Sequence, residues 1–149
     1  MKRIKLMCFS KNDSLCQGWA MITNIATNDI IVYKYLSKKK SLFTDKYYAP
    51  VMSNFRYKKG KTYYSPLKIN IHHNKGDKFI IRAEDGFHSF VTIENLIHYL
   101  ALGKYIDFKK HIIGKFIIPK GTTYIENDEQ IVSDRIKFIG VIPLKDLDR

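Results

Sequence analysis

The sequence has few cysteines, few acidic residues in its first half and no long hydrophobic run. Two cysteines, Cys8 and Cys16, are too few for a disulfide framework. Seven residues separate them, and neither this spacing nor the distance to His72 and His73 resembles the usual pairs of zinc ligands. No apolar segment approaches the roughly 18 residues that span a membrane. We therefore expect reduced thiols, no metal and no membrane segment, in a cytoplasmic protein.

Acidic residues are scarce in the N-terminal half. Residues 1–61 contain 13 Lys/Arg and 3 Asp/Glu, whereas residues 62–149 contain 13 and 11, so nearly all of the net charge of +12 lies in the first part. Codon bias in an A/T-rich genome is an alternative explanation for abundant lysine, isoleucine and tyrosine. It does not explain why acids nearly vanish between Ile30 and Lys61. A positive surface is an argument about partners and not about fold.

The segment between Tyr33 and Tyr64 combines nine basic and nine aromatic residues around a single acid, Asp45. Cationic side chains hold phosphates, and flat rings stack on bases. The segment therefore predicts an anionic partner, which could be nucleic acid, a nucleotide signal of host defence or an acidic host protein. The candidate binding residues are Lys38, Lys39, Lys40, Arg56, Tyr57, Lys58, Lys59, Lys61 and Tyr63.

A chain of 149 residues has the length of one domain and can bury roughly 70% of its unfolded surface. We expect a single domain over residues 1–149 with a basic half at residues 1–61. Strands are predicted where β-branched and aromatic residues gather. They are Arg3–Phe9, Ile30–Leu36, His111–Ile118, Thr123–Ile125 and Arg135–Ile142.

Turn signals predict two hairpins, one at Phe55–Ser65 with Gly60 at positive φ, and one around Asn74–Asp77. The polar stretch Ser37–Lys46 is predicted to be a loop. One helix is expected over about residues 92–102, because Thr92 suits its N-cap and Gly103 its C-terminal end. We therefore predict an α+β fold with a mostly antiparallel sheet and one main helix.

The sequence contains no complete catalytic motif. Gly60-Lys61-Thr62 resembles the end of a phosphate-binding loop, but Phe55 stands where the first glycine belongs. His88, at a predicted turn before the helix, could act as an acid or base or hold an anion, and a structural role is favoured. The acids Glu126, Asp128 and Glu129 fall at a predicted hairpin tip, where a solvated turn is the default. A non-enzymatic protein without a cofactor is the favoured interpretation.

Three motifs resemble those of small proteins common in phages and prophages. They are Tyr57-Lys58-Lys59-Gly60-Lys61-Thr62-Tyr63, Gly86-Phe87-His88-Ser89-Phe90 and Ile118-Pro119-Lys120-Gly121-Thr122, and Tyr124 with Val132-Ser133-Asp134 completes the pattern. The first motif carries one extra residue here. The resemblance covers about residues 57–142 and implies a phage origin without implying an activity. It favours an accessory protein of a phage that acts in the host cytoplasm, with a component of the virion as an alternative.

The Gly86–Phe90 motif and its helix, followed by Phe116–Thr122 and Glu129–Phe138, also resemble the C-terminal half of ADP-ribosyltransferases. The resemblance implies NAD as cofactor and assigns to Glu129 the contact with the nicotinamide ribose, with His88 as a further catalytic candidate. The arginine or histidine of that family's first strand and its Ser-Thr-Ser element have no counterpart in this sequence. As an enzyme, the protein would therefore be a degenerate transferase.

Overall fold

The structure, a computed structural model, describes residues 8–10, 23–39, 47–50, 56–74, 78–103 and 109–143. These residues form twelve strands and a single helix. The expected α+β class is therefore wrong, because the described chain is predominantly antiparallel sheet and the helix is a minor element. The sequence signals for the helix were strong, whereas several short strands were not recognisable.

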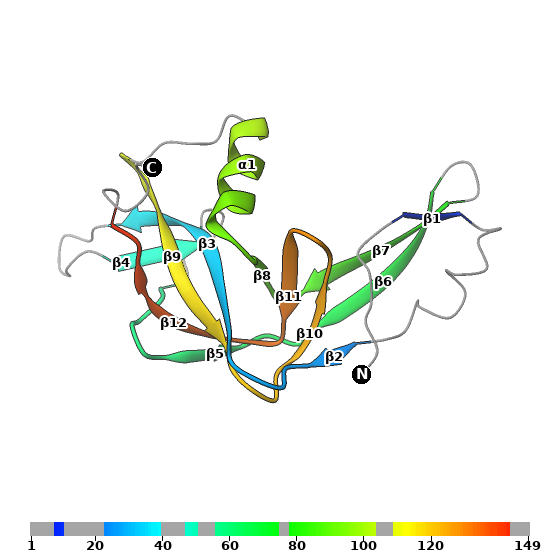
Figure 1. Cartoon of the computed structure of the whole chain (residues 1–149), viewed down its shortest axis with the longest axis horizontal. Helices are drawn as coiled ribbons and strands as arrows, with labels where there is room; N and C mark the ends of the chain where they lie inside the picture. The colour runs from blue at the N-terminus through cyan, green and yellow to red at the C-terminus, as the bar shows by residue number, and fades with distance from the viewer. Residues whose placement is uncertain are drawn as a thin grey trace.

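The larger sheet contains nine strands and is curved (Figure 1). Their spatial order is β2 (Asn24–Ile25), β10 (Thr123–Glu126), β11 (Gln130–Ser133), β8 (Phe87–Phe90), β3 (Ile30–Lys39), β9 (His111–Ile118), β12 (Arg135–Val141) and β5 (Thr62–Tyr64), and β4 (Tyr47–Pro50) also pairs with β3. The central ladder joins β3 to β9 through eight residue pairs, from Ile30 opposite Ile118 to Ser37 opposite His111.

A smaller sheet has the order β1 (Cys8–Ser10), β7 (Lys78–Asp85) and β6 (Lys68–Asn74). Strands β6 and β7 pair in antiparallel fashion as the predicted second hairpin, and the turn between them lies outside the described residues. Figure 1 shows this pair as a ribbon that projects away from β3, β9 and β12.

Helix α1 (Ile93–Gly103) begins at the expected N-cap, where the hydroxyl of Thr92 accepts a hydrogen bond from the Asn95 backbone N–H at 3.0 Å. Leu96 and Leu100 are buried against Ile113 of β9. Tyr33 and Tyr35 of β3 pack against the same cluster. The helix therefore covers one face of the sheet at the end where β9 begins.

The main core lies on the opposite face of the sheet from α1. Side chains alternate between the two faces of a strand, so Val32 and Leu36 point away from the helix and into this core. Phe116 lies opposite Val32 and stacks with Phe138 at a centroid distance of 5.0 Å. Burying such aromatic rings supplies a large share of the hydrophobic stabilisation.

Several expectations about local structure need correction. Residues Ser37–Lys39 were predicted to belong to a loop, but they continue β3 and pair with β4. The rest of that predicted loop, residues 40–46, lies outside the described chain, as does most of the predicted strand Arg3–Phe9. The turn after Arg56 forms as expected, with Gly60 at a φ of +84° and the Lys61 N–H 3.1 Å from the Lys58 carbonyl. Strand β5 after this turn pairs with β12 and with no strand before the turn among the described residues, so the expected Phe55–Ser65 hairpin is wrong although its turn forms.

We expect the substitution Phe116→Ala to lower the free energy of unfolding by about 3–5 kcal/mol, because it removes a fully buried ring and leaves a cavity. The control Ile31→Ala lies one strand away but on the solvated side, and it should cost clearly less. Urea denaturation of both variants measures the difference. Equal losses would mean that the two faces of this ladder do not differ in burial.

Candidate functional site

One half of the sheet face that carries α1 is left uncovered by the helix. Cross-strand partners share a face of the sheet, and the pairs Ile31–Ile117, Ile117–Lys137, Lys137–Thr62 and Arg135–Tyr64 connect four neighbouring strands. Lys115 lies two residues from Ile117 and therefore on the same side. We call this surface the open face, and it consists of Ile31, Thr62, Tyr64, Lys115, Ile117, Arg135 and Lys137.

The open face is accessible while the reverse side of the same strands is buried. Tyr64 is 67% exposed and Ile31 is 47% exposed. Lys115, Ile117 and Lys137 are half-buried, and Arg135 is exposed. Their sequence neighbours point to the main core and are buried, namely Val32, Tyr63, Phe116, Ile118, Ile136 and Phe138. Each of these strands therefore buries one side in the main core and directs its polar side chains toward solvent on the other side.

The open face carries three cations, Lys115, Arg135 and Lys137, and none of its seven positions is acidic. Within the described chain none of these three cations forms an ion pair. Among the described residues, the Arg135 guanidinium donates to the carbonyl of Gly121 at 3.5 Å. Uncompensated cations on a common surface create a positive potential that attracts anions and speeds their association.

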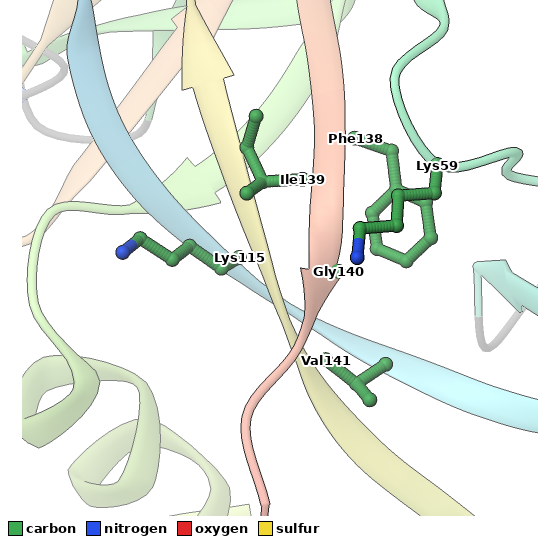
Figure 2. A pocket seen from close by; sticks show the side chains of 6 residues that line it. All are labelled: Lys59, Lys115, Phe138, Ile139, Gly140 and Val141. Atoms are coloured by element: carbon green, nitrogen blue, oxygen red, sulfur yellow. The ribbon is translucent and has the colours of Figure 1, made fainter.

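A concavity of about 370 Å³ adjoins Lys115, at the irregularity in β12. It is lined by Lys59, Lys115, Phe138, Ile139, Gly140 and Val141 (Figure 2). Lys59 reaches it from the turn before β5, and its Cε lies 3.9 Å from the place where a Cβ on Gly140 would be. In Figure 2 the side chain of Lys115 extends away from that of Lys59, so the two ammonium groups do not converge on one point.

The two predicted stacking residues are core residues. Tyr57 is 5% exposed and Tyr63 is 9% exposed, and Tyr57 packs edge-on against Phe116 at a centroid distance of 4.9 Å. Burial raises the pKa of the Tyr57 hydroxyl above its ordinary value, with a second contribution from Tyr63. Neither ring is therefore available to a base.

The Tyr63 hydroxyl holds the basic turn in place. It accepts a hydrogen bond from the Lys58 backbone N–H at 2.7 Å and donates to the Arg56 carbonyl at 3.2 Å. The ammonium of Lys61 lies 5.3 Å from the centre of the Tyr63 ring, a cation–π distance. The side chains of Arg56, Lys58, Lys59 and Lys61 are exposed around this turn.

The lysines at the end of β3 lie apart from the open face. Lys38 is half-buried, and its backbone N–H donates to the Lys110 carbonyl at 2.8 Å. It is seven residues from Ile31 along the same strand, which corresponds to roughly 23 Å. Lys39 pairs with Tyr47, and Lys40 lies outside the described residues. Of the predicted basic residues, the structure thus brings the turn, and not Lys38, close to the open face.

The Gly86–Phe90 motif has a structural role in the larger sheet. Phe87 to Phe90 form β8 instead of a turn before the helix, and each pairs with a residue of β11. A Cβ on Gly86 would lie 3.0 Å from Cγ1 of Val132 and 3.1 Å from the Ser133 carbonyl oxygen, and the φ of +109° there also favours glycine. The Pro119–Thr122 segment is likewise a turn, closed by the Thr122 N–H on the Pro119 carbonyl at 3.1 Å.

The structure does not bring the transferase candidates together. Glu129 lies at the exposed tip between β10 and β11, where the side-chain oxygen of Asn127 accepts a hydrogen bond from its N–H at 2.9 Å. The Glu129 carbonyl accepts a hydrogen bond from the Val91 backbone N–H. His88 pairs with Val132, which is three residues after Glu129 along the chain, so Glu129 and His88 are separated by roughly 10 Å along the strand. The concavity at β12 includes neither side chain.

A partly accessible lysine occupies a gap in the sheet. On one edge of β3, β8 pairs at Tyr33 and β4 pairs from Leu36 onward, and Lys34 lies between them. Its ammonium donates to the His88 carbonyl. Desolvation lowers the pKa of Lys34 to about 8. The pKa of the His88 imidazole is lowered, mainly by loss of hydration and to a smaller extent by the positive charge of Lys34.

Comparison with protein-family models, with curated proteins and with solved structures finds no match to this chain. Among the described residues, no group of three or more His, Cys, Asp or Glu side chains could hold a metal ion. The one described helix is too short to cross a bilayer. The open face is therefore interpreted from its own chemistry.

Sequence reasoning missed Lys115, Arg135 and Lys137, which lie far from the basic segment at Tyr33–Tyr64. Lys115 stands alone among apolar residues, and Ile136 separates Arg135 from Lys137, so no run of basic residues marks these positions. The available signal was alternation, because Lys115 and Lys137 occupy solvent-facing positions of two predicted strands. The order of the strands, which places these positions side by side, is not encoded locally.

We expect Lys34→Met to change the pH dependence of stability. Below pH 8 the lysine is charged in both states, so folding bears the cost of burying the charge; between about pH 8 and 10.5 only the unfolded state stays protonated. Stability of the native protein should therefore rise relative to Lys34→Met across this window, by on the order of 1–3 kcal/mol.

Urea denaturation at pH 7.0, 8.5 and 9.5 measures this change. Lys120→Met, at an exposed turn residue, controls for the loss of one positive charge. A stability difference between the native protein and Lys34→Met that is constant over this range would contradict the assigned burial of the ammonium.

Proposed function

We propose that this protein is a non-enzymatic nucleic-acid-binding protein that contacts phosphates through the open face and the adjoining Lys58–Lys61 turn. The observation that carries the proposal is the common placement of Lys115, Arg135 and Lys137 on a solvated, acid-free sheet surface. In keeping with the resemblance to phage proteins, the binding would serve an accessory role in the host cell.

Cations without an acidic partner gain most from contact with a phosphate. An exposed lysine in an ion pair gains little by exchanging its partner for a phosphate, but the three cations of the open face have no such partner within the described chain. Each phosphate they neutralise releases counterions that were condensed on the nucleic acid. The gain is entropic, independent of sequence and sensitive to salt.

The spread of the cations favours a polymer over a small anion. Arg135 and Lys137 lie two residues apart on β12, roughly 7 Å along the strand, and Lys115 lies on the neighbouring strand. Lys59 and Lys115 line one concavity without directing their ammonium groups toward a common point (Figure 2). A row of phosphates can meet such separated charges, whereas a single phosphate cannot reach them all.

We expect Lys137→Glu to weaken binding to a fluorescein-labelled 20-nucleotide DNA and to reduce its salt dependence. Loss of one phosphate contact should make the slope of log K against log salt shallower by roughly 0.7–0.9. The double variant Lys115→Glu/Lys137→Glu should lose about twice as much. Fluorescence anisotropy between 50 and 300 mM NaCl measures both effects.

Lys110→Glu is the matched control, because it makes the same charge change at an exposed residue before β9, at the opposite end of that strand from Ile117. Thermal unfolding of all variants checks that the fold is retained. The proposal is wrong if the native protein binds neither single-stranded nor duplex DNA or RNA at 50 mM salt. It is also wrong if Lys110→Glu weakens binding as much as Lys137→Glu.

A further inference from the structure

We infer that the nucleic acid bound by the open face is single-stranded, and that the ring of Tyr64 stacks on one of its bases. This inference rests on the proposed function and specifies the class of ligand for that site. Three features of the open face support it, namely the exposure of Tyr64, the width of the face and its apolar residues.

Tyr64 is a well-placed stacking surface. Its side chain is 67% exposed, although tyrosine is usually at least partly buried in folded proteins. It projects from β5, an edge strand in the described sheet, directly opposite Arg135. A base on the ring would therefore have a guanidinium beside it for its phosphate. Base–ring stacking of this kind requires an unstacked base.

The shape of the open face is unsuited to reading a duplex groove. Its four strands span roughly 14 Å at 4.7–4.9 Å per strand, whereas the major groove of B-DNA, about 12 Å wide, admits a helix or a two-stranded ribbon. Within the described chain, the single helix α1 packs on the sheet through Leu96 and Leu100. A duplex could meet this face only through its outer phosphates.

The apolar members of the face have a role only with exposed bases. Ile31 is 47% exposed and pairs across the strands with Ile117, which in turn pairs with Lys137. Ile117 has Lys115 two residues away on its own strand and Lys137 opposite it on β12. Phosphates gain nothing from contact with isoleucine, whereas the faces and edges of unpaired bases bury apolar area there.

The test compares three variants against three labelled ligands, a 20-nucleotide oligo(dT), a 20-base-pair duplex and heparin as a base-free polyanion. Tyr64→Thr removes the ring but keeps a residue suited to a strand, and Tyr64→Phe keeps the ring. Tyr99→Ala removes a different exposed ring, on α1. Anisotropy at 100 mM NaCl gives the affinities, and thermal unfolding confirms folding.

We expect the native protein to prefer oligo(dT) to the duplex. Tyr64→Thr should weaken oligo(dT) binding roughly 5- to 150-fold and leave heparin binding unchanged, and Tyr64→Phe should restore affinity. Equal affinity for duplex and single strand, or full oligo(dT) binding by Tyr64→Thr, would overturn this inference. If Lys137→Glu still weakens binding in that case, the proposed function stands; if no nucleic acid binds, both fall.

Discussion

The fold depends on the antiparallel ladder between β3 and β9. Its eight residue pairs present one side to the main core through Val32, Leu36 and Phe116, and the other side to α1 through Tyr33 and Ile113. Strand β3 also receives β8 and β4 on its second edge. Because both hydrophobic clusters and the solvated half of the sheet originate from these two strands, a one-residue shift of their register would exchange buried and exposed side chains throughout.

The same ladder explains why a positive surface can form at no cost to the core. On the side of the sheet that carries α1, the helix covers Tyr33 and Ile113. Beyond the helix, the same side of β3 and β9 consists of Ile31, Lys115 and Ile117. The lysine is tolerated there because its ammonium reaches water while its stem lies on the sheet. Lys34, on the core side of the partner strand β3, is only partly accessible, and burial of its ammonium lowers its pKa. The charge of Lys115 is therefore available to a ligand, whereas the ammonium of Lys34 is bound to the His88 carbonyl inside the fold.

The sequence was sufficient for elements with strong local signals. Strand His111–Ile118 is rich in β-branched and aromatic residues and forms with the predicted bounds. The Thr92 cap marks the start of the helix, and Gly60 lies in a turn as predicted. The fold class was wrong because strands of two to four residues, such as β2, β5 and β11, are too short to show a period. The long strands β3, β9 and β12 were predicted, whereas these short strands were invisible to periodicity.

The candidate site was less predictable because it depends on pairing between distant segments. Tyr57 and Tyr63 belong to the basic-aromatic segment, but composition does not separate a ring that packs on Phe116 from one that faces solvent. Tyr64 differs from Tyr63 only by one step of alternation, and this step moves it from the core to the surface. Lys137 is next to Thr62 only because β12 pairs with β5.

The register irregularity in β12 has a consequence for how this strand tolerates changes in length. Ile139 is the extra residue between Phe138, opposite Phe116, and Gly140, opposite Lys115. Its removal would leave a strand that alternates regularly, with Val141 and Ile142 still directed to their present clusters. Removal of an interior residue away from the irregularity, such as Ile136, would reverse the side chains on one flank. Ile139 is thus a position where β12 can lose a residue while Phe138 keeps its place in the core and both flanks keep their faces.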